Sequence, residues 1–211
     1  MFKTNRLRKP AIRFLSVLSM IVAVSSPAFA TAIVGQPAPD FSITDTNGVK
    51  RSLTDLKGHI VALEWTNADC PFVRKHYGSS NMQTLQKEAT DKGIVWLSVI
   101  SSAPGHQGYV SAEEANALTV SRKAHPTGIL LDPDGTLGHL YSAKTTPHMF
   151  LIDKDGILRY AGGIDSIAST DVDDIAKAEP YFREAYQALL HDEVIKNPIT
   201  RSYGCGVKYA E

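Results

Sequence analysis

The sequence predicts an α/β domain with a central mixed β-sheet flanked by helices on both faces. Short apolar runs of strand length alternate with helical patterns, which is typical of a mainly parallel sheet covered on both sides. The last two apolar runs are separated by the turn 154–156 (Lys-Asp-Gly), so we expect an antiparallel hairpin that makes the sheet mixed. No internal repeat, low-complexity tract or long linker appears, and we therefore expect one domain over residues 31–211.

The first half of this domain alternates strand and helix signals. Asn47-Gly48 marks a hairpin turn, and Gly58 is typical of a helix end. Apolar residues recur at helical spacing after Pro71 and stop before Gly93. In order, we expect a hairpin over 38–53, a helical turn over 54–58, a buried strand over 59–65, one long helix over about 71–91 and a buried strand over 94–100.

The second half continues the alternation. Ser111, followed by Glu113 and Glu114, is a helix start signal, and Asp134-Gly135 marks a turn. In order, we expect a helix from Ser111 to about 124, a strand over 127–132, a short helix over 137–142, hairpin strands over 148–153 and 157–164, and a final helix over about 180–193.

The N-terminus has the pattern of a secretory signal peptide. Five basic residues and no acidic ones come before the apolar run 14–24, which leads to Ala28-Phe29-Ala30. The apolar run is too short for a membrane-spanning helix, which needs about 20 residues. We therefore expect residues 1–30 to be cleaved, the mature chain to begin near Thr31, and the protein to be periplasmic or secreted, with no membrane insertion afterwards.

Removal of this segment changes the charge balance. The whole chain has 22 basic and 22 acidic residues; losing five basic ones leaves 17 against 22, a net charge of −5. A negative net charge argues against a nucleic-acid binder or a binder of anionic membranes. The remaining 181 residues can bury a sizeable core without disulfides, yet two cysteines in an oxidising compartment make disulfide chemistry expected.

Cys70 follows a buried strand and is followed at once by Pro71, a residue preferred at the first helical position. Cys70 would then be the N-cap, with its sulfur facing free N–H groups and the positive end of the helix dipole. Arg74 would add a cation and favour the thiolate, whereas Asp69 would oppose it. The alternative is a small apolar residue that fills the junction between strand and helix.

Glu64 is anomalous because a strand buried on both faces should be apolar throughout. A half-buried carboxylate near the thiol would have a raised pKa and could shuttle protons during thiol exchange. Alternatively, Glu64 pairs with a lysine or arginine, or it lies at an open edge of the sheet.

The sequence resembles the thioredoxin-like superfamily, in particular its redoxin branch of alkyl hydroperoxide reductases and thiol-specific antioxidants. The resemblance covers nearly the whole mature chain and rests on Trp65, the Cys-Pro helix start and the segments 34–58, 145–162 and 204–209. It implies a thioredoxin-like fold, a reactive thiol at Cys70, and a cis-proline at Pro147, after Thr146, that faces this thiol. Backbone groups beside that proline could then pair with an extended substrate.

The sequence also departs from the family patterns. Val73 stands where a thioredoxin motif has its second cysteine, and Leu63 and Asn67 stand where classical peroxiredoxins have proline and threonine. Neither a local dithiol nor the usual peroxide-activating threonine is present, so a hydroperoxide and a protein disulfide both remain as substrates.

Cys205 is the second cysteine, between Gly204 and Gly206 in a tail without a strong helical or strand pattern after Pro198. Flanking glycines lower the cost of moving the chain, which suits a resolving cysteine that attacks oxidised Cys70. Alternatively, a permanent Cys70–Cys205 bridge ties down the tail, with a loop-closure contribution of about 4–5 kcal/mol.

We therefore predict an exported thiol-dependent oxidoreductase that needs no cofactor and uses a thioredoxin-like protein or a small thiol as reductant. A redox-inert binding or scaffold domain is the rival interpretation. A third is copper delivery, in which His76 and His148 would join Cys70, although soft copper sites usually use more sulfur.

Overall fold

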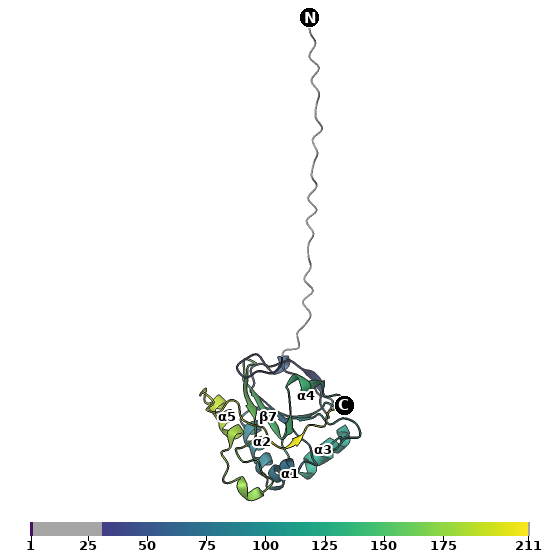
Figure 1. The fold of residues 1–211 in the computed structure, drawn as a ribbon, viewed down its shortest axis with the longest axis vertical. Coiled ribbons are helices and arrows are strands. Elements are labelled where there is room, and N and C mark those ends of the chain that lie inside the picture. The colour runs from purple at the N-terminus through teal and green to yellow at the C-terminus, as the bar shows by residue number, and fades with distance from the viewer. Residues whose placement is uncertain (2–30, 211) are drawn as a thin grey trace.

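The computed structural model describes Met1 and residues 31–210 of the 211-residue chain (Figure 1). The expected signal segment, apart from Met1, lies outside the described residues. Within the described part of the chain, no helix is long and apolar enough to cross a membrane.

The central sheet has five strands in the order β5-β4-β3-β7-β8. β3 lies in the middle, parallel to β4 and antiparallel to β7, while β4 is parallel to β5 and β7 antiparallel to β8. The sheet is therefore mixed, as predicted. Its strands are β3 (Val61–Trp65), β4 (Val95–Ile100), β5 (Gly128–Leu131), β7 (His148–Ile152) and β8 (Leu158–Gly162).

Two apolar layers cover the two faces of the sheet. Along β3, Ala62 packs into one layer, while Val61 and Leu63 pack into the other, because side chains alternate along a strand. The first layer contains residues of α1 (Pro71–Gly78), α2 (Asn81–Asp91) and α5 (Tyr181–Leu190), three of the helices arranged around β7 in Figure 1. The second contains residues of α4 (Thr136–Leu140) and residues beside the hairpin β1 (Ser42–Thr44) and β2 (Lys50–Ser52).

The short elements follow the sequence signals closely. The turn at Asn47-Gly48 joins β1 to β2, as predicted. Helix α3 (Ala112–Ser121) begins with a capping box, in which Ser111 and Glu114 each accept a hydrogen bond from the other's backbone N–H. Two single turns of 3-10 helix are η1 (Thr54–Leu56), at the predicted helical turn, and η2 (Val172–Asp174), which was not predicted.

The predicted single helix over 71–91 is wrong, because the structure has two helices there. α1 ends at Gly78, and the Ser79 hydroxyl donates to the carbonyls of Lys75 and His76 in the last turn. Ser80 is in the left-handed region, at φ +63°, and starts α2 in a new direction.

A second, two-stranded sheet was not predicted. β6 (Thr145–Thr146) pairs antiparallel with β9 (Cys205–Gly206), which lies in the tail where the sequence shows no strand pattern. β6 directly precedes Pro147 and β7, so this pairing brings the C-terminal tail to the end of a central strand.

Candidate active site

Cys70 lies where β3 passes into α1. It is the N-cap of α1 with Pro71 in the first turn, as predicted, and its side chain is fully buried. Asn67 holds the preceding loop: its backbone carbonyl accepts from the Cys70 N–H (3.1 Å), and its side chain accepts from the Asp69 N–H (2.9 Å). The strand–helix junction therefore fixes the position of the sulfur.

Thr146 and Pro147 face this sulfur. The Thr146–Pro147 peptide bond is cis, as the family resemblance implied, and both residues are buried. The Cys70 thiol donates a hydrogen bond of 3.1 Å to the Thr146 carbonyl oxygen. Residues 76 positions apart in the sequence are thereby brought together.

Cys205 joins the same site through the β6–β9 pairing, in which Thr146 is the direct partner of Cys205. Both cysteines are free in the structure, and each lies near enough to the other to displace its pKa. Two cysteines 135 positions apart are therefore in reach of each other, which was the expectation from the sequence.

The surroundings of the two thiols shift their pKa values in opposite directions. Burial opposes ionisation of Cys70, but hydrogen bonds from the Cys205 thiol and from the Val73 and Cys205 backbone outweigh it and lower the pKa of Cys70. Burial and the neighbouring Cys70 raise the pKa of Cys205 to about 11. The thiolate is thus favoured at Cys70 and the protonated thiol at Cys205. The helix end contributes through Val73, although the sulfur makes no well-formed capping hydrogen bond.

Arg74 reaches the N-terminal end of α1, as expected, but there its charge is paired. Its side chain is mostly exposed and binds the loop before α1, through Asp69 (3.0 Å) and the Ala68 carbonyl (3.1 Å). The two opposing charges expected around Cys70 therefore pair with each other. This ion pair leaves the hydrogen bonds described above as the groups that favour the thiolate.

Glu64 is fully buried on the central strand and forms no ion pair. The two alternatives, pairing with a lysine or arginine and a place at an open edge of the sheet, are therefore both wrong. Its carboxylate accepts four hydrogen bonds from neutral groups. The donors are Tyr77 (2.8 Å), Gln86 (3.0 Å), Trp96 (2.9 Å) and Ser98 (3.1 Å). Burial outweighs these bonds and raises the pKa of Glu64, as predicted. A role in proton transfer stays a prediction.

The tail before Cys205 is held by a buried polar cluster. Tyr203 donates its hydroxyl proton to Asp165 and lies 3.3 Å from His76 Nε2 on α1. Asn81 lies 2.9 Å from the other ring nitrogen of His76. This connected network fixes the chain two residues before Cys205.

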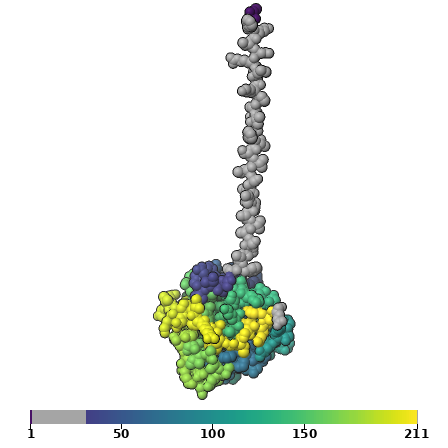
Figure 2. All heavy atoms as spheres, viewed as in Figure 1, coloured from purple at the N-terminus to yellow at the C-terminus, as the bar shows by residue number. Residues whose placement is uncertain are grey.

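The tail after Cys205 is also attached. The Val207 N–H donates to the Lys144 carbonyl (3.1 Å), and the Tyr209 hydroxyl donates to the Ala143 carbonyl (2.8 Å). The Tyr209 ring stacks on His139 with ring centres 4.1 Å apart. Figure 2 shows the C-terminal residues, in yellow, as a band across one face of the molecule. The tail is thus attached to the domain on both sides of Cys205, whereas its glycines suggested a loosely held segment.

The two histidines considered for copper have other partners. His76 lies in the cluster with Tyr203, and His148 accepts a hydrogen bond from the Lys144 N–H (3.2 Å) and packs on Phe150. Burial lowers the pKa of His76 to about 3 and that of His148 to about 4. Among the described residues, no three histidine, cysteine, aspartate or glutamate side chains are grouped as metal ligands.

Sequence reasoning missed Tyr203 and Gln86. Gln86 falls on the same helical face as Met82 and Ala89, so a polar residue there signals a buried partner, which is Glu64. Tyr203 lies two residues before Cys205 and carries no such signal, because its partners come from α1 and from the chain after β8.

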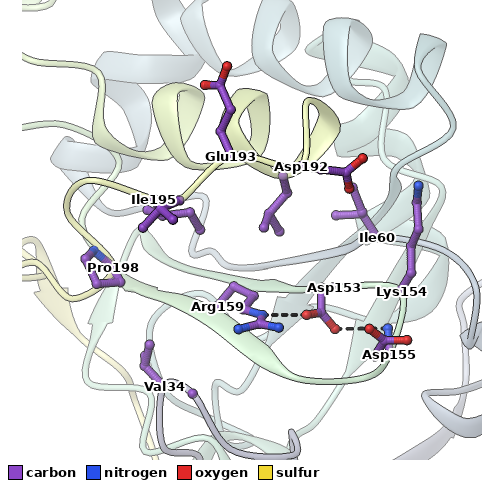
Figure 3. Close-up of a pocket in the computed structure, with 13 residues that line it drawn as sticks. Val34, Ile60, Asp153, Lys154, Asp155, Arg159, Asp192, Glu193, Ile195 and Pro198 are labelled. Atoms are coloured by element: carbon purple, nitrogen blue, oxygen red, sulfur yellow. Dashed lines mark hydrogen bonds and ion pairs between the residues drawn. The ribbon is translucent and has the colours of Figure 1, made fainter.

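One cavity formed by the described residues lies away from these thiols. It has a volume of about 450 Å³ and is formed beside Ile60, Asp153, Arg159, Glu193 and Pro198 (Figure 3). Ile60 directly precedes β3 and Asp153 follows β7, whereas Cys70 follows the other end of β3. The cavity therefore lies at the opposite end of the strands from Cys70 and does not contribute to the thiol site.

Comparisons with known proteins agree with this architecture. A structure from Geobacillus kaustophilus, an uncharacterized conserved protein, superposes with a TM-score of 0.71 at 22% identity, over 90% of this chain and 98% of that one. A hypothetical protein from Sinorhizobium meliloti gives 0.70 at 20% identity, over 86% and 97%. A thiol:disulfide interchange protein DsbE from Chlorobium tepidum, described as putative, gives 0.54 at 22%, over 77% and 98%. At these identities the likenesses establish the fold, which is thioredoxin-like as predicted.

Two sequence matches go further. The thioredoxin-like protein YneN of Bacillus subtilis is 32% identical over 126 residues, which cover 59% of this chain and 68% of that protein. The AhpC/TSA family model matches residues 34–161, more than half of the chain and including Cys70, Thr146 and Pro147. The chain is a thioredoxin-like redoxin and belongs to the AhpC/TSA family.

Proposed function

We propose that the protein is an exported thiol-dependent oxidoreductase in which Cys70 attacks the substrate and Cys205 resolves the product. The observation that carries this proposal is that Thr146 brings the two free thiols together: its carbonyl accepts from the Cys70 thiol, and Cys205 is its partner in the β6–β9 pairing. The pKa values of the two thiols are displaced in opposite directions. A nucleophile with a lowered pKa beside a protonated partner is the arrangement that thiol exchange requires.

The chemistry balances with either substrate. With a hydroperoxide, the Cys70 thiolate takes the terminal oxygen, the O–O bond breaks and an alcohol leaves; Cys205 then attacks the sulfenic acid sulfur and water leaves. With a disulfide, Cys70 forms a mixed disulfide and releases one thiol, and Cys205 releases the other. Both routes end in a Cys70–Cys205 disulfide, which a thiol reductant must open.

The rival proposal, a static Cys70–Cys205 staple in a redox-inert domain, has its own support. The tail is tied on both sides of Cys205, through Tyr203 and Val207, so a bridge would join segments that are already in place. The two proposals differ in how readily the bridge exchanges.

The reduction potential of the pair separates the two proposals. It can be measured by mass spectrometry of alkylated protein after equilibration in glutathione buffers. A potential above about −250 mV is expected for an exchangeable redox pair. A bridge that stays closed below about −300 mV would identify a staple, and the enzyme proposal would fall.

Export is proposed from the N-terminal sequence alone: the basic start, the apolar run 14–24 and Ala28-Phe29-Ala30. Cell fractionation followed by N-terminal mass spectrometry is expected to find a periplasmic or secreted chain beginning near Thr31. A cytosolic chain that retains residues 1–30 would contradict it.

A further inference from the structure

Three chain segments meet at the carbonyl group of Thr146. Its oxygen accepts the hydrogen bond from the Cys70 thiol at 3.1 Å. Gly204 packs directly against the same oxygen, and Cys205 pairs with Thr146 across the β6–β9 ladder. The tail strand therefore places its cysteine beside Cys70 by backbone pairing with β6.

The two glycines around Cys205 are not equivalent. A Cβ added at Gly204 would lie 2.0 Å from the Thr146 oxygen, and the backbone there has φ +134°, which side chains rarely adopt. A Cβ at Gly206 would lie 4.0 Å from its nearest neighbour, the Lys144 oxygen, and meets no obstacle. A strand that brings a cysteine to this position needs glycine before the cysteine and tolerates a side chain after it.

The tail also closes the site. The Cys70 side chain is fully buried, and the band of C-terminal residues in Figure 2 includes the strand that pairs with β6. A protein segment can reach the Cys70 sulfur by the route that Cys205 uses only after β9 has left β6. The β6–β9 ladder joins only two residue pairs, and so short a ladder contributes little stability by itself.

We propose that β9 occupies the position of the substrate, and that the partner is an extended protein segment in which glycine precedes a disulfide-bonded cysteine. This inference rests on the proposed function and names its substrate class. The partner segment replaces β9 on β6 and adds its own strand, a known mode of peptide recognition. Thr146 supplies the backbone pairing, and the contact with its oxygen selects glycine.

The exchange balances as ordinary thiol–disulfide chemistry. The Cys70 thiolate attacks the partner's Gly-Cys sulfur, the partner's disulfide breaks, and its other sulfur leaves as a thiolate. The partner segment, still joined to Cys70 through the mixed disulfide, then separates from β6, and β9 returns to β6. The Cys205 sulfur attacks the Cys70 sulfur, the mixed disulfide breaks, and the partner leaves with both sulfurs reduced. The protein is oxidised by two electrons, and the partner's disulfide is reduced by two.

The test compares two peptides of the same composition with the reduced full-length protein. The peptides are Ac-Tyr-Gly-Cys-Ala-Val-NH₂ and Ac-Tyr-Ala-Cys-Gly-Val-NH₂, each supplied as its symmetric disulfide, with the release of peptide thiol followed in time. We expect the Gly-Cys-Ala peptide to react about tenfold faster or more, because alanine before the cysteine overpacks against Thr146. Equal rates, or faster reaction of the Ala-Cys-Gly peptide, would overturn the inference.

Matched variants of the chain test the same contact from the other side. Gly204→Ala should expel β9 and speed alkylation of Cys70 in the folded protein by about tenfold or more, whereas Gly206→Ala should leave the rate near that of wild type. Equal alkylation rates in the two variants would overturn the inference.

A hydroperoxide control separates failure of the inference from failure of the proposed function. If hydroperoxide forms the Cys70–Cys205 disulfide but neither peptide disulfide reacts, the substrate assignment is wrong and the thiol-dependent function stands. If neither hydroperoxide nor any disulfide oxidises the reduced pair, the substrate assignment and the proposed function are both wrong.

Discussion

Cys70 and Cys205 are chemically identical groups in contact, yet their pKa values move in opposite directions. Cys70 gains hydrogen bonds from the Cys205 thiol and from backbone N–H groups, whereas Cys205 faces a neighbour that becomes negative. The same contact therefore lowers one pKa and raises the other. This asymmetry favours the thiolate at Cys70, and the causes that lower its pKa include no charged side chain.

The Cys205 thiol is predicted to supply a large part of this effect. In Cys205→Ala the donor is lost, so the pKa of Cys70 should rise; in Cys205→Ser a hydroxyl remains to donate, and the rise should be smaller. The measurement is the pH midpoint of Cys70 alkylation, which reports ionisation separately from access. The same midpoint in wild type and both variants would show that Cys205 does not stabilise the thiolate.

Glu64 carries a second prediction at this scale. Its folded pKa is raised, so the folded chain holds this proton more tightly, and stability is lost as pH rises above the unfolded value of about 4.5. Glu64→Gln has no such ionisation and can still accept from Gln86, Trp96 and Ser98. In urea unfolding, the free energy of unfolding of the variant should increase relative to that of wild type between pH 4 and pH 7. A difference that is constant with pH would contradict the raised pKa.

The residues of the site differ in how far the sequence could predict them. Cys70 was predictable because strand, cysteine, proline and helix follow one another locally. The partner of Arg74 was not, because a long exposed side chain settles on whichever anion is nearest, here Asp69. Likewise, the burial of Glu64 could be inferred from its place in an apolar strand. Its hydrogen-bond donors could not, because they lie on α1, α2 and β4.

At the scale of elements, the local signals again succeeded where partners are close in sequence. The capping box at Ser111 and the turn at Asn47-Gly48 formed as predicted. The break at Ser79-Ser80 did not show in the apolar spacing, since Tyr77 and Met82 both still face the core. The β6–β9 pairing joins residues about 60 positions apart and depends on backbone groups, so no periodicity in the tail revealed it.

Tyr203 is predicted to be the anchor that holds β9 in register. Tyr203→Phe removes the proton donor to Asp165 and leaves two buried polar groups short of a partner, a loss of about 1–3 kcal/mol. Amide hydrogen exchange should then be faster for residues 203–207. The control is Tyr109→Phe, at a half-exposed ring. Equal protection of the tail in all three proteins would show that the anchor lies elsewhere.

At the scale of the whole molecule, two buried histidines are predicted to make stability depend on pH under acid conditions. His76 and His148 are neutral in the fold, with pKa values of about 3 and about 4, whereas an unfolded histidine titrates near 6.5. Between these values the unfolded chain binds more protons than the folded one. The contribution of these two histidines to stability is therefore full above about pH 6.5 and is lost as pH drops through this window. Glu64 acts with the opposite sign above about pH 4.5, so single variants are needed to separate the contributions.

His76→Gln isolates one of these contributions. The amide can still donate toward Tyr203 but cannot be protonated, and the groups around it (Tyr203, Asp165, Asn81 and Lys75) are unchanged. Urea unfolding from pH 7 to pH 4 should show a shallower acid loss than in wild type, by up to about 1.4 kcal/mol per pH unit. His59→Gln, at an exposed histidine, should follow the wild-type curve. If His76→Gln loses stability in parallel with wild type, the cluster that anchors the tail is not what makes the fold acid-sensitive, and the slope must come from His148 or from groups outside the two buried histidines.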